Sequence, residues 1–395
     1  MHFDTKLIHD PRLFSEHNPS TATPIFQTAT FAQSSSAAND RYDYSRSGNP
    51  TRDVLEQQLA RLEEGEKGLA FSSGMAAITA VTSLVHAGET IVTGCDLYGG
   101  TSRLLGHLKE AQQIEVVYLH TWNDDALKRI REFKPKLVLI ETPTNPLQKV
   151  VDISRVAKHA HKVGALLAVD NTMLSPYLQQ PLNLGADIVI HSATKFLSGH
   201  ADVTAGAVMT KNFKLGEKLA WIQNATGTAL APFDCWVLSR GIKTLGVRLD
   251  RQQRNARRIA KFLVEHPLVK KVFFPSLYEG DARAIHLRQT TGDGSVLSFT
   301  TGSLEVSQRI LDRLKLCAIT VSFGSVATTI SLPSRMSHAS LDNDLKEVEP
   351  IPEDLIRLSV GIEDVADILA DLESAFDSAS TNIRKKKVLQ SSASI

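Results

Sequence analysis

Short apolar segments alternate with helical segments between residues 66 and 210, and this alternation constrains the fold more than any other feature. Seven segments are typical of strands: KGLAFSS, ETIVTGC, IEVVYL, KLVLIET, GALLAVDN, ADIVIHS and GAVMT. Strands that alternate with helices indicate βα units and a mainly parallel sheet that is covered on both faces. Ligands of such sheets bind at the carboxyl ends of the strands. We therefore predict an α/β fold with a ligand site at that edge.

The rest of the chain predicts an arm, a second domain and a tail. Residues 1–60 contain one clear amphipathic helix, in PTRDVLEQQLARLEEGE, and otherwise form an arm too polar to make its own core. A long helix in GVRLDRQQRNARRIAKFLVEH leads to strand candidates VKKVFF, GSVLSF, CAITVSF and LIRLSVG. We predict a large α/β domain at residues 61–255, a smaller C-terminal α/β domain at residues 256–380 and a tail at residues 381–395.

Composition argues against several classes of protein. The chain of 395 residues has a formal net charge of +1, so no basic excess indicates a nucleic-acid partner. Its apolar runs are shorter than the roughly 20 residues that span a bilayer, and MHFDTKLIHDPRLFSEHNPS contains no apolar signal core. We therefore expect a cytoplasmic protein without a membrane partner. Three widely spaced cysteines and the lack of an H-E-x-x-H motif indicate neither a disulfide framework nor a metal site.

The first chemical signal is FSSGMAAITAV, in which a strand passes through small residues into a helix. Ser73, Gly74 and Met75 would present backbone amides at the helix N-terminus, where the helix dipole favours a phosphate. A tight turn between a strand and a helix explains the same residues equally well. This segment alone therefore does not establish a phosphate site.

Two charged residues follow apolar strand segments, where desolvation is costly. The carboxylate of Asp170, at the end of LLAVD, would be stabilised by a cationic cofactor ring or by backbone amides at a helix cap. The amine of Lys195, after ADIVIHSAT, would either form a Schiff base with an aldehyde or extend to solvent. An amide cluster, a carboxylate and an amine in sheet order match pyridoxal 5'-phosphate, which presents a phosphate, a ring nitrogen and an aldehyde.

Eight motifs occur in the order and spacing of the trans-sulfuration, or Cys/Met metabolism, family of pyridoxal-phosphate enzymes, which this chain resembles from about residue 18 to 375. They are YDYSRSGNPTR, SSGMAAI, DLYGGT, ETPTNP, DNT, HSATKFLSGH, SFGSV and LIRLSVGIEDVADIL. The resemblance implies the PLP-dependent transferase-like fold (fold type I), with a mainly parallel sheet in a large cofactor domain. It also implies a homotetramer built as a dimer of dimers.

The resemblance also implies roles for individual residues. Lys195 would bind the cofactor aldehyde and move the substrate α-proton, Asp170 would pair with the ring nitrogen, and Tyr98 would stack on the ring and assist proton transfer. The other cofactor-binding residues would be Ser73, Gly74, Met75, Ser192 and Thr194, joined by Tyr44 and Arg46 from the arm of a neighbouring subunit. The substrate carboxylate would be bound by Arg357, whose planar fork suits that task, with Asn145 and Ser322 beside it.

Within the family, YDYSRSGNPTRD, LAPFDCWVLSRGIKTLGVR and VSFGSV followed by MSHASL most resemble the plant-type cystathionine β-lyases. Many γ-acting members carry a glutamate shortly after S-x-G, where this chain has Ala327 and Thr328. The resemblance therefore implies a carbon–sulfur lyase that converts L-cystathionine to homocysteine, pyruvate and ammonia in methionine biosynthesis. A cystathionine γ-lyase or γ-synthase is the alternative. A nucleotide-binding protein has less support, because the sequence has neither a G-x-G-x-x-G nor a Walker-type motif.

Overall fold

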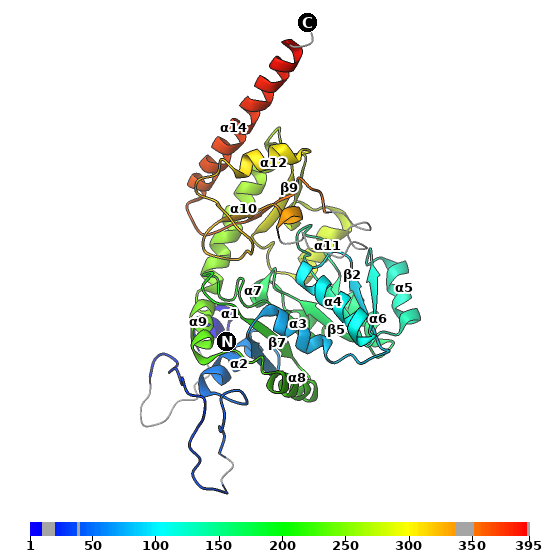
Figure 1. The fold of residues 1–395 in the computed structure, drawn as a ribbon, viewed down its shortest axis with the longest axis vertical. Coiled ribbons are helices and arrows are strands. Elements are labelled where there is room, and N and C mark those ends of the chain that lie inside the picture. The colour runs from blue at the N-terminus through cyan, green and yellow to red at the C-terminus, as the bar shows by residue number, and fades with distance from the viewer. Residues whose placement is uncertain (10–19, 38–39, 337–350, 393–395) are drawn as a thin grey trace.

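A seven-stranded sheet forms the centre of the larger part of the molecule in the computed structural model, which describes residues 1–9, 20–37, 40–336 and 351–392 (Figure 1). Its strands are β1 (Lys67–Phe71), β2 (Thr90–Gly94), β3 (Glu115–Leu119), β4 (Leu137–Glu141), β5 (Leu166–Asp170), β6 (Ile188–His191) and β7 (Gly206–Thr210). The spatial order is β1-β7-β6-β5-β4-β2-β3; β2 to β6 are parallel, whereas β7 is antiparallel to β1 and β6. The predicted α/β class and all seven predicted strands are confirmed.

Helices cover both faces of this sheet, which explains why its strands are apolar at successive positions. One face packs against α2 (Pro50–Leu62), α5 (Asp124–Phe133), α6 (Ile153–His161) and α9 (Pro232–Ile242). The other face packs against α3 (Gly74–Thr82), α4 (Gly99–Gln112) and α8 (Phe213–Thr226). In β6, Val189 belongs to the first core, whereas Ile188 and Ile190 belong to the second. Both faces of β6 are therefore buried, so the polar side chains of this segment lie at the ends of the strand.

A five-stranded sheet forms the smaller part of the molecule. Its strands, in spatial order, are β10 (Ala318–Ile319), β11 (Thr329–Ser331), β12 (Ile356–Ser359), β9 (Val296–Thr300) and β8 (Lys271–Phe273). The core of this part also takes side chains from α12 (Leu304–Leu311) and α14 (Val365–Ser392). Four of the five strands match predicted segments. The exception is β11, whose three residues were too short to be recognised in the sequence.

A single helix, α10 (Leu245–Glu265), connects the two parts. Leu245 and Leu249 on its first half belong to the core of the large sheet, whereas Ile259 and Leu263 on its second half belong to the core of the smaller sheet. The domain boundary predicted near residue 255 thus lies inside this helix. The remaining elements are short: α1 (Phe3–Ile8), α7 (Ser175–Leu178), α11 (Gly280–Gln289) and the 3-10 helices Pro181–Leu184, Pro275–Leu277 and Pro333–Arg335.

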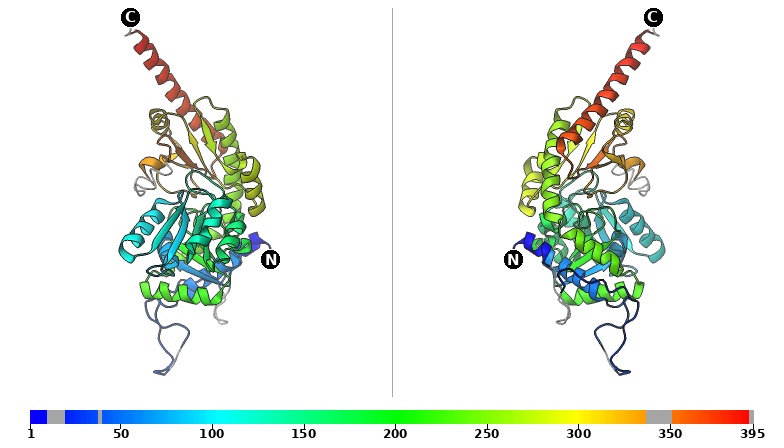
Figure 2. Two further views of the ribbon diagram at one scale, coloured as in Figure 1. Left: turned by 90° about the vertical axis from the view of Figure 1, so that its right-hand side faces the viewer. Right: turned by 90° about the vertical axis from the view of Figure 1, so that its left-hand side faces the viewer.

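Part of the arm and the C-terminal helix extend beyond these cores (Figures 1 and 2). At the N-terminus, α1 packs on the body through the buried Leu7, whereas the described residues between α1 and α2 run out from the body, with an isolated bridge between Thr30 and Tyr44. At the other end, α14 continues through Ser392 across most of the predicted tail, whose residues 393–395 lie outside the described part, as does most of MSHASL. None of the helices in the described part has both the length and the apolar character needed to cross a bilayer.

We expect Phe299→Ala to destabilise the protein by about 3–5 kcal/mol, because a large cavity would remain in the smaller core. The side chain is 0% exposed, and its ring centroid lies 6.0 Å from that of Phe376. Urea unfolding followed by circular dichroism measures the change. Phe213→Ala is the control, since Phe213 is 58% exposed and should change stability by less than about 0.5 kcal/mol. A loss below about 1 kcal/mol for Phe299→Ala would contradict this account of the core.

Candidate active site

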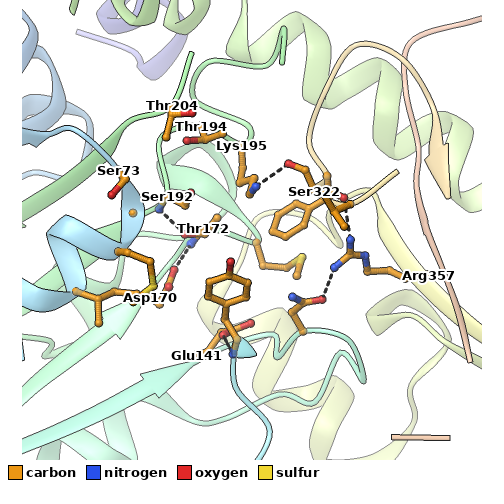
Figure 3. Close-up of a pocket in the computed structure, with 18 of the residues that line it drawn as sticks. Ser73, Glu141, Asp170, Thr172, Ser192, Thr194, Lys195, Thr204, Ser322 and Arg357 are labelled. Atoms are coloured by element: carbon orange, nitrogen blue, oxygen red, sulfur yellow. Dashed lines mark hydrogen bonds between the residues drawn. The ribbon is translucent and has the colours of Figure 1, made fainter. Parts of the chain in front are cut away.

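A cavity of about 490 Å³ lies at the carboxyl ends of β4, β5 and β6, where the large sheet meets the smaller part (Figure 3). This is the edge of the sheet at which the sequence predicted a ligand. Eleven of the predicted site residues line the cavity: Ser73, Gly74, Met75, Tyr98, Asn145, Asp170, Ser192, Thr194, Lys195, Ser322 and Arg357. The fold therefore brings together side chains that are separated by up to 284 positions in the sequence, from Ser73 to Arg357.

Lys195 stands in the turn after β6 and points its amine into the cavity (Figure 3). Its Nζ donates a hydrogen bond to Ser322 Oγ at 2.6 Å, and no carboxylate of the described residues forms an ion pair with it. Desolvation, reinforced by the positive charge of Arg357, lowers the pKa of Lys195 to about 8. An appreciable fraction of this amine is therefore uncharged and nucleophilic near neutral pH.

The loop that carries Ser322 is held close to Lys195 by unusual backbone geometry. Ser322 has φ of +81°, a conformation that non-glycine residues rarely adopt, and Gly324 has φ of +85°. A Cβ at Gly324 would lie 2.9 Å from the backbone nitrogen of Phe196, so a side chain there would push the loop away. Strain of this kind concentrates at functional sites, where the surrounding structure maintains it.

Asp170 ends β5 with its carboxylate at the cavity. Its Oδ1 accepts the backbone N–H of Thr172 at 3.0 Å, so a backbone amide in a turn accounts for part of its stabilisation. Asp170 is not a helix cap, because the next helix, α7, begins at Ser175 with Leu174 as its N-cap. Desolvation nevertheless raises the pKa of Asp170, although hydrogen bonds from Thr172, and the electrostatic effect of the nearby His191, oppose that rise. A cationic group on the cavity side would remove this penalty, because it would favour the ionised carboxylate.

The first turn of α3 faces the same cavity. The hydroxyl of Ser73 accepts the backbone N–H of Ala76 at 3.0 Å, which leaves the earlier amides of Gly74 and Met75 without a partner inside the helix. A Cβ at Gly74 would lie 2.8 Å from the Cβ of Ser192, so only glycine leaves this wall of the cavity open. The backbone thus provides an anion-binding helix terminus next to Ser192.

The hydroxyl of Thr194 forms hydrogen bonds within the fold that the sequence did not predict. Its hydroxyl donates to the carbonyl of Ala205 at 3.2 Å and accepts the Ala205 N–H at 2.9 Å. To donate to a phosphate, this hydroxyl would have to give up its bond to the carbonyl. Thr204, which also lines the cavity, was not predicted.

Arg357 lies on β12 at the opposite wall of the cavity and is 2% exposed. Its Nη1 donates to Asn145 Oδ1 at 2.9 Å and its Nη2 donates to the carbonyl of Ser322 at 2.8 Å. Desolvation lowers the pKa of Arg357 to about 10, yet the guanidinium remains charged at neutral pH. Both described hydrogen-bond partners are neutral, so this cation is available to a carboxylate ligand.

Of the three remaining predicted site residues, Tyr98 lies at the cavity, whereas Tyr44 and Arg46 of the arm do not. Tyr98 lines the cavity at the start of α4, and its backbone N–H donates to Glu141 Oε2 at 3.2 Å. Tyr44 and Arg46 do not line the cavity of their own chain. Instead, Arg46 donates to the backbone oxygen and to Oδ1 of Asn224 at 2.8 and 2.7 Å. Their contact with the site of a neighbouring subunit remains a prediction.

The cavity also contains residues that the sequence prediction did not include. They are Ile78, Arg103, Glu141, Thr172, Met173, Thr204, Val321, Phe323 and Met336. Glu141 ends a strand in the same way as Asp170, so the argument used for Asp170 could have found it. The apolar residues and Thr204 carry no chemical signal in the sequence, since they reach the site only through the folding of distant loops.

These groups fit pyridoxal 5'-phosphate. The open amides of α3 fit its phosphate, Asp170 fits a ring nitrogen that must stay protonated, and the amine of Lys195 fits its aldehyde. The fold and the site therefore define a PLP-dependent enzyme of fold type I. The chain belongs to the Cys/Met metabolism family of PLP-dependent enzymes, whose family model matches residues 4–377.

Individual relatives within this family differ in the reaction named for them. The chain is 48% identical to the chloroplastic cystathionine β-lyase of Arabidopsis thaliana over 355 residues, which cover 90% of this chain and 76% of the relative. It is 44% identical to a cystathionine γ-lyase of Bacillus subtilis, over 94% of this chain and 98% of the relative. It is also similar to the structure of a cystathionine γ-synthase from Xanthomonas oryzae pv. oryzae in complex with cystathionine, with a TM-score of 0.94, 37% identity and coverage of 96% and 99%.

The lowered pKa of Lys195 predicts how the cofactor-free protein captures pyridoxal 5'-phosphate. With a pKa of about 8, the uncharged fraction of the amine rises about tenfold between pH 7 and 9 and then levels off. An ordinary lysine, with a pKa near 10.4, would rise about a hundredfold over the same range. Stopped-flow absorbance gives the capture rate, and Nα-acetyl-lysine amide in the same buffers corrects for titration of the cofactor. Equal pH profiles for the protein and this amide would contradict the prediction.

Proposed function

We propose that the protein is a cystathionine β-lyase, which cleaves L-cystathionine with water to homocysteine, pyruvate and ammonia. The observation that carries this proposal over a γ-reaction is the distribution of acids in the site. The only carboxylates lining the described cavity, Glu141 and Asp170, both lie at the sheet side. Within this cavity the wall around Ser322 consists of Val321, Phe323 and Met336, with no described carboxylate to bind a distal ammonium group. Asp202 lies in the adjoining cavity beside Ser322, where its Oδ1 accepts the hydroxyl of Ser198 at 3.2 Å.

The segment after Ser322 supports the same choice. Ala327 offers no charge, and the buried Thr328 donates its hydroxyl to Glu363 Oε2 at 2.9 Å. Thr328 is therefore committed to the core of the smaller part rather than to the cavity. The sequence similarity to plant cystathionine β-lyase points in the same direction, whereas the similarity to γ-lyases and γ-synthases keeps those reactions as the alternative.

Arg357 and Asn145 would fix the α-carboxylate of the substrate. The guanidinium is already oriented by Asn145 and by the carbonyl of Ser322, so little conformational freedom is lost when a carboxylate binds. Binding at this wall would place Cα of the substrate near Lys195, because Lys195 and Arg357 both bond to Ser322 (Figure 3). Orientation of this kind contributes to the rate because the reacting atoms are held in position.

Lys195 would remove the proton from Cα. When bound, pyridoxal 5'-phosphate supplies an aldehyde that captures the substrate amine and a cationic ring that withdraws electrons from Cα. Asp170 would keep that ring nitrogen protonated, and the amides of Gly74 and Met75 would hold the phosphate. Ser322 holds the amine of Lys195 at 2.6 Å, so the base has a defined position before it accepts the proton. Loss of the thiolate from Cβ then completes the β-elimination.

The proposal also covers the quaternary structure of the enzyme and its cellular location. Tyr44 and Arg46 would complete the phosphate site of a neighbouring subunit, in a homotetramer that acts in cytoplasmic methionine biosynthesis. Support for the subunit contact comes from large apolar side chains exposed near the arm and near α8, including Phe26, Tyr44 and Trp221, of which Trp221 is 71% exposed. Exposed apolar side chains gain free energy when another chain packs against them.

Incubation of the holoenzyme with L-cystathionine tests the reaction directly. Chromatography of the keto acid and the thiol should show pyruvate with homocysteine. The appearance of 2-oxobutyrate with cysteine would overturn the proposal in favour of γ-cleavage. Lys195→Ala is the control for the base, and its turnover should fall by a factor of at least about 10²–10⁴. A Lys195→Ala enzyme within tenfold of the parent would refute the role of this lysine.

Mixing two inactive variants tests the arm. Lys195→Ala and Arg46→Ala homo-oligomers should each be impaired, the second through weak cofactor binding. Exchange of subunits would create sites in which the arm comes from one chain and the lysine from the other, so about a quarter of the parental activity should return. Arg41→Ala, which changes an exposed arm residue paired with Asp53, is the matched control for Arg46→Ala. Full activity of Arg46→Ala alone, or no recovery after demonstrated subunit exchange, would contradict the shared site.

A further inference from the structure

Three acids lie at the carboxyl ends of three neighbouring strands. Asp96 follows β2, Glu141 ends β4 and Asp170 ends β5, and these strands are adjacent in the order β5-β4-β2. Asp96 Oδ2 accepts the hydroxyl of Thr144, and Asp170 accepts the N–H of Thr172. Glu141 therefore stands between two other carboxyl groups, at the bottom of the cavity (Figure 3).

Glu141 connects two loops that the proposed mechanism uses separately. Its Oε2 accepts the backbone N–H of Tyr98 at 3.2 Å, at the start of α4. The backbone N–H of Asn145, in the loop after β4, also bonds to its carboxyl group. Asn145 in turn holds Arg357 through a bond of 2.9 Å. One side chain thus joins the aromatic wall of the cavity to the pair that would bind the substrate carboxylate.

Crowding of acids disfavours a charge on Glu141. Desolvation, and then the carboxylates of Asp170 and Asp96, raise its pKa well above the ordinary range. Only Asp170 has a task that needs a negative charge, since it would face the cofactor ring. An ionised Glu141 would also weaken binding of the substrate carboxylate, because its negative charge would act on Arg357 and repel the substrate.

We propose that Glu141 is a positioning residue that acts in its protonated form, and that it fixes Tyr98 and the Asn145–Arg357 pair without adding a second negative charge to the site. The proposal rests on the roles proposed above for Tyr98, Asn145 and Arg357, but not on the choice between β- and γ-cleavage. It predicts that Glu141→Gln, whose neutral amide has the size of the carboxyl group, keeps this positioning function. Glu141→Ala, which removes the side chain, should lose it.

Other groups that titrate or carry charge lie near Glu141 or line the same cavity. They are Asp96 and Tyr98 from the β2–α4 turn, Asp170 from β5, Lys195 from the turn after β6, Arg103 from α4 and Arg357 from β12. Lys195 titrates in an accessible range, so the pH dependence of the parent enzyme alone does not isolate Glu141. The difference between the parent and Glu141→Gln does, because all the other groups are common to both.

Binding of L-alanine to the holoenzyme is the most direct measurement, because alanine carries the α-carboxylate and amine but no leaving group. Its Kd is obtained from the absorption change of the cofactor. Glu141→Gln should bind alanine within about threefold of the parent at pH 7, whereas Glu141→Ala should bind at least about tenfold more weakly. At alkaline pH the parent should lose affinity as Glu141 ionises, and Glu141→Gln should lack this part of the loss.

Visible circular dichroism of the cofactor provides a readout of the ring environment. Glu141→Ala should change this signal through movement of Tyr98, and Glu141→Gln should keep the parental signal. If Glu141→Gln binds alanine as weakly as Glu141→Ala, the protonated form is not the one that acts. If Glu141→Ala binds as the parent does, Glu141 positions nothing. Should Glu141→Ala fail to fold, the comparison of parent and Glu141→Gln across pH still decides, since identical profiles would overturn the proposal.

These outcomes are independent of the proposed reaction. Alanine binding reports the carboxylate site in a lyase of either regiochemistry, so 2-oxobutyrate as the product of cystathionine would refute the β-lyase proposal and leave this test intact. Conversely, pyruvate as product with parental alanine binding in Glu141→Ala would support the β-lyase and refute the role of Glu141.

Discussion

An amine that burial and a neighbouring guanidinium make easy to deprotonate is the feature on which the rest of this site depends. Lys195 comes from the large sheet, whereas Ser322, which accepts its hydrogen bond, and Arg357, which lowers its pKa, come from the smaller part. The reactive state of the lysine is therefore a property of the contact between the two parts. A displacement of the smaller part would return the amine to water and raise its pKa toward the ordinary value.

The site is divided electrostatically along the same contact. Glu141 and Asp170 lie at the ends of strands of the large sheet, and Arg357, which we propose to bind the substrate carboxylate, lies on the smaller sheet. Phe323 lies next to both cations, with Lys195 Nζ and Arg357 Cζ at 5.4 and 5.3 Å from its ring centroid. An aromatic face beside two positive charges reduces their repulsion without neutralising either of them. In the proposed function, this arrangement lets the substrate present its carboxylate to Arg357 and its Cα to Lys195.

Most of the fold could be predicted because its strands have strong hydrophobic patterns in the sequence. The elements that were not predicted have weak patterns or none. The seven strands of the large sheet were visible because each is a continuous apolar run, but nothing in GAVMT signals that β7 is antiparallel. β11 is three residues long and had no pattern to recognise. In the site, Lys195 and Asp170 were found because desolvated charges demand partners. Residues such as Val321, Thr204 and Met336 come together only through tertiary packing, and the engagement of Thr194 with Ala205 is a property of the folded turn.

The helix that links the two parts limits how this enzyme can be taken apart. Because α10 begins in one core and ends in the other, its 21 residues, roughly 30 Å in length, form part of both cores rather than a flexible linker between them. A chimaera joined to a relative at residue 255 would splice two half-helices that must remain in phase, and each half would face a core from a different parent. Successful recombination would have to place the crossover outside the helix and rebuild the apolar face that α10 presents to the half it leaves behind.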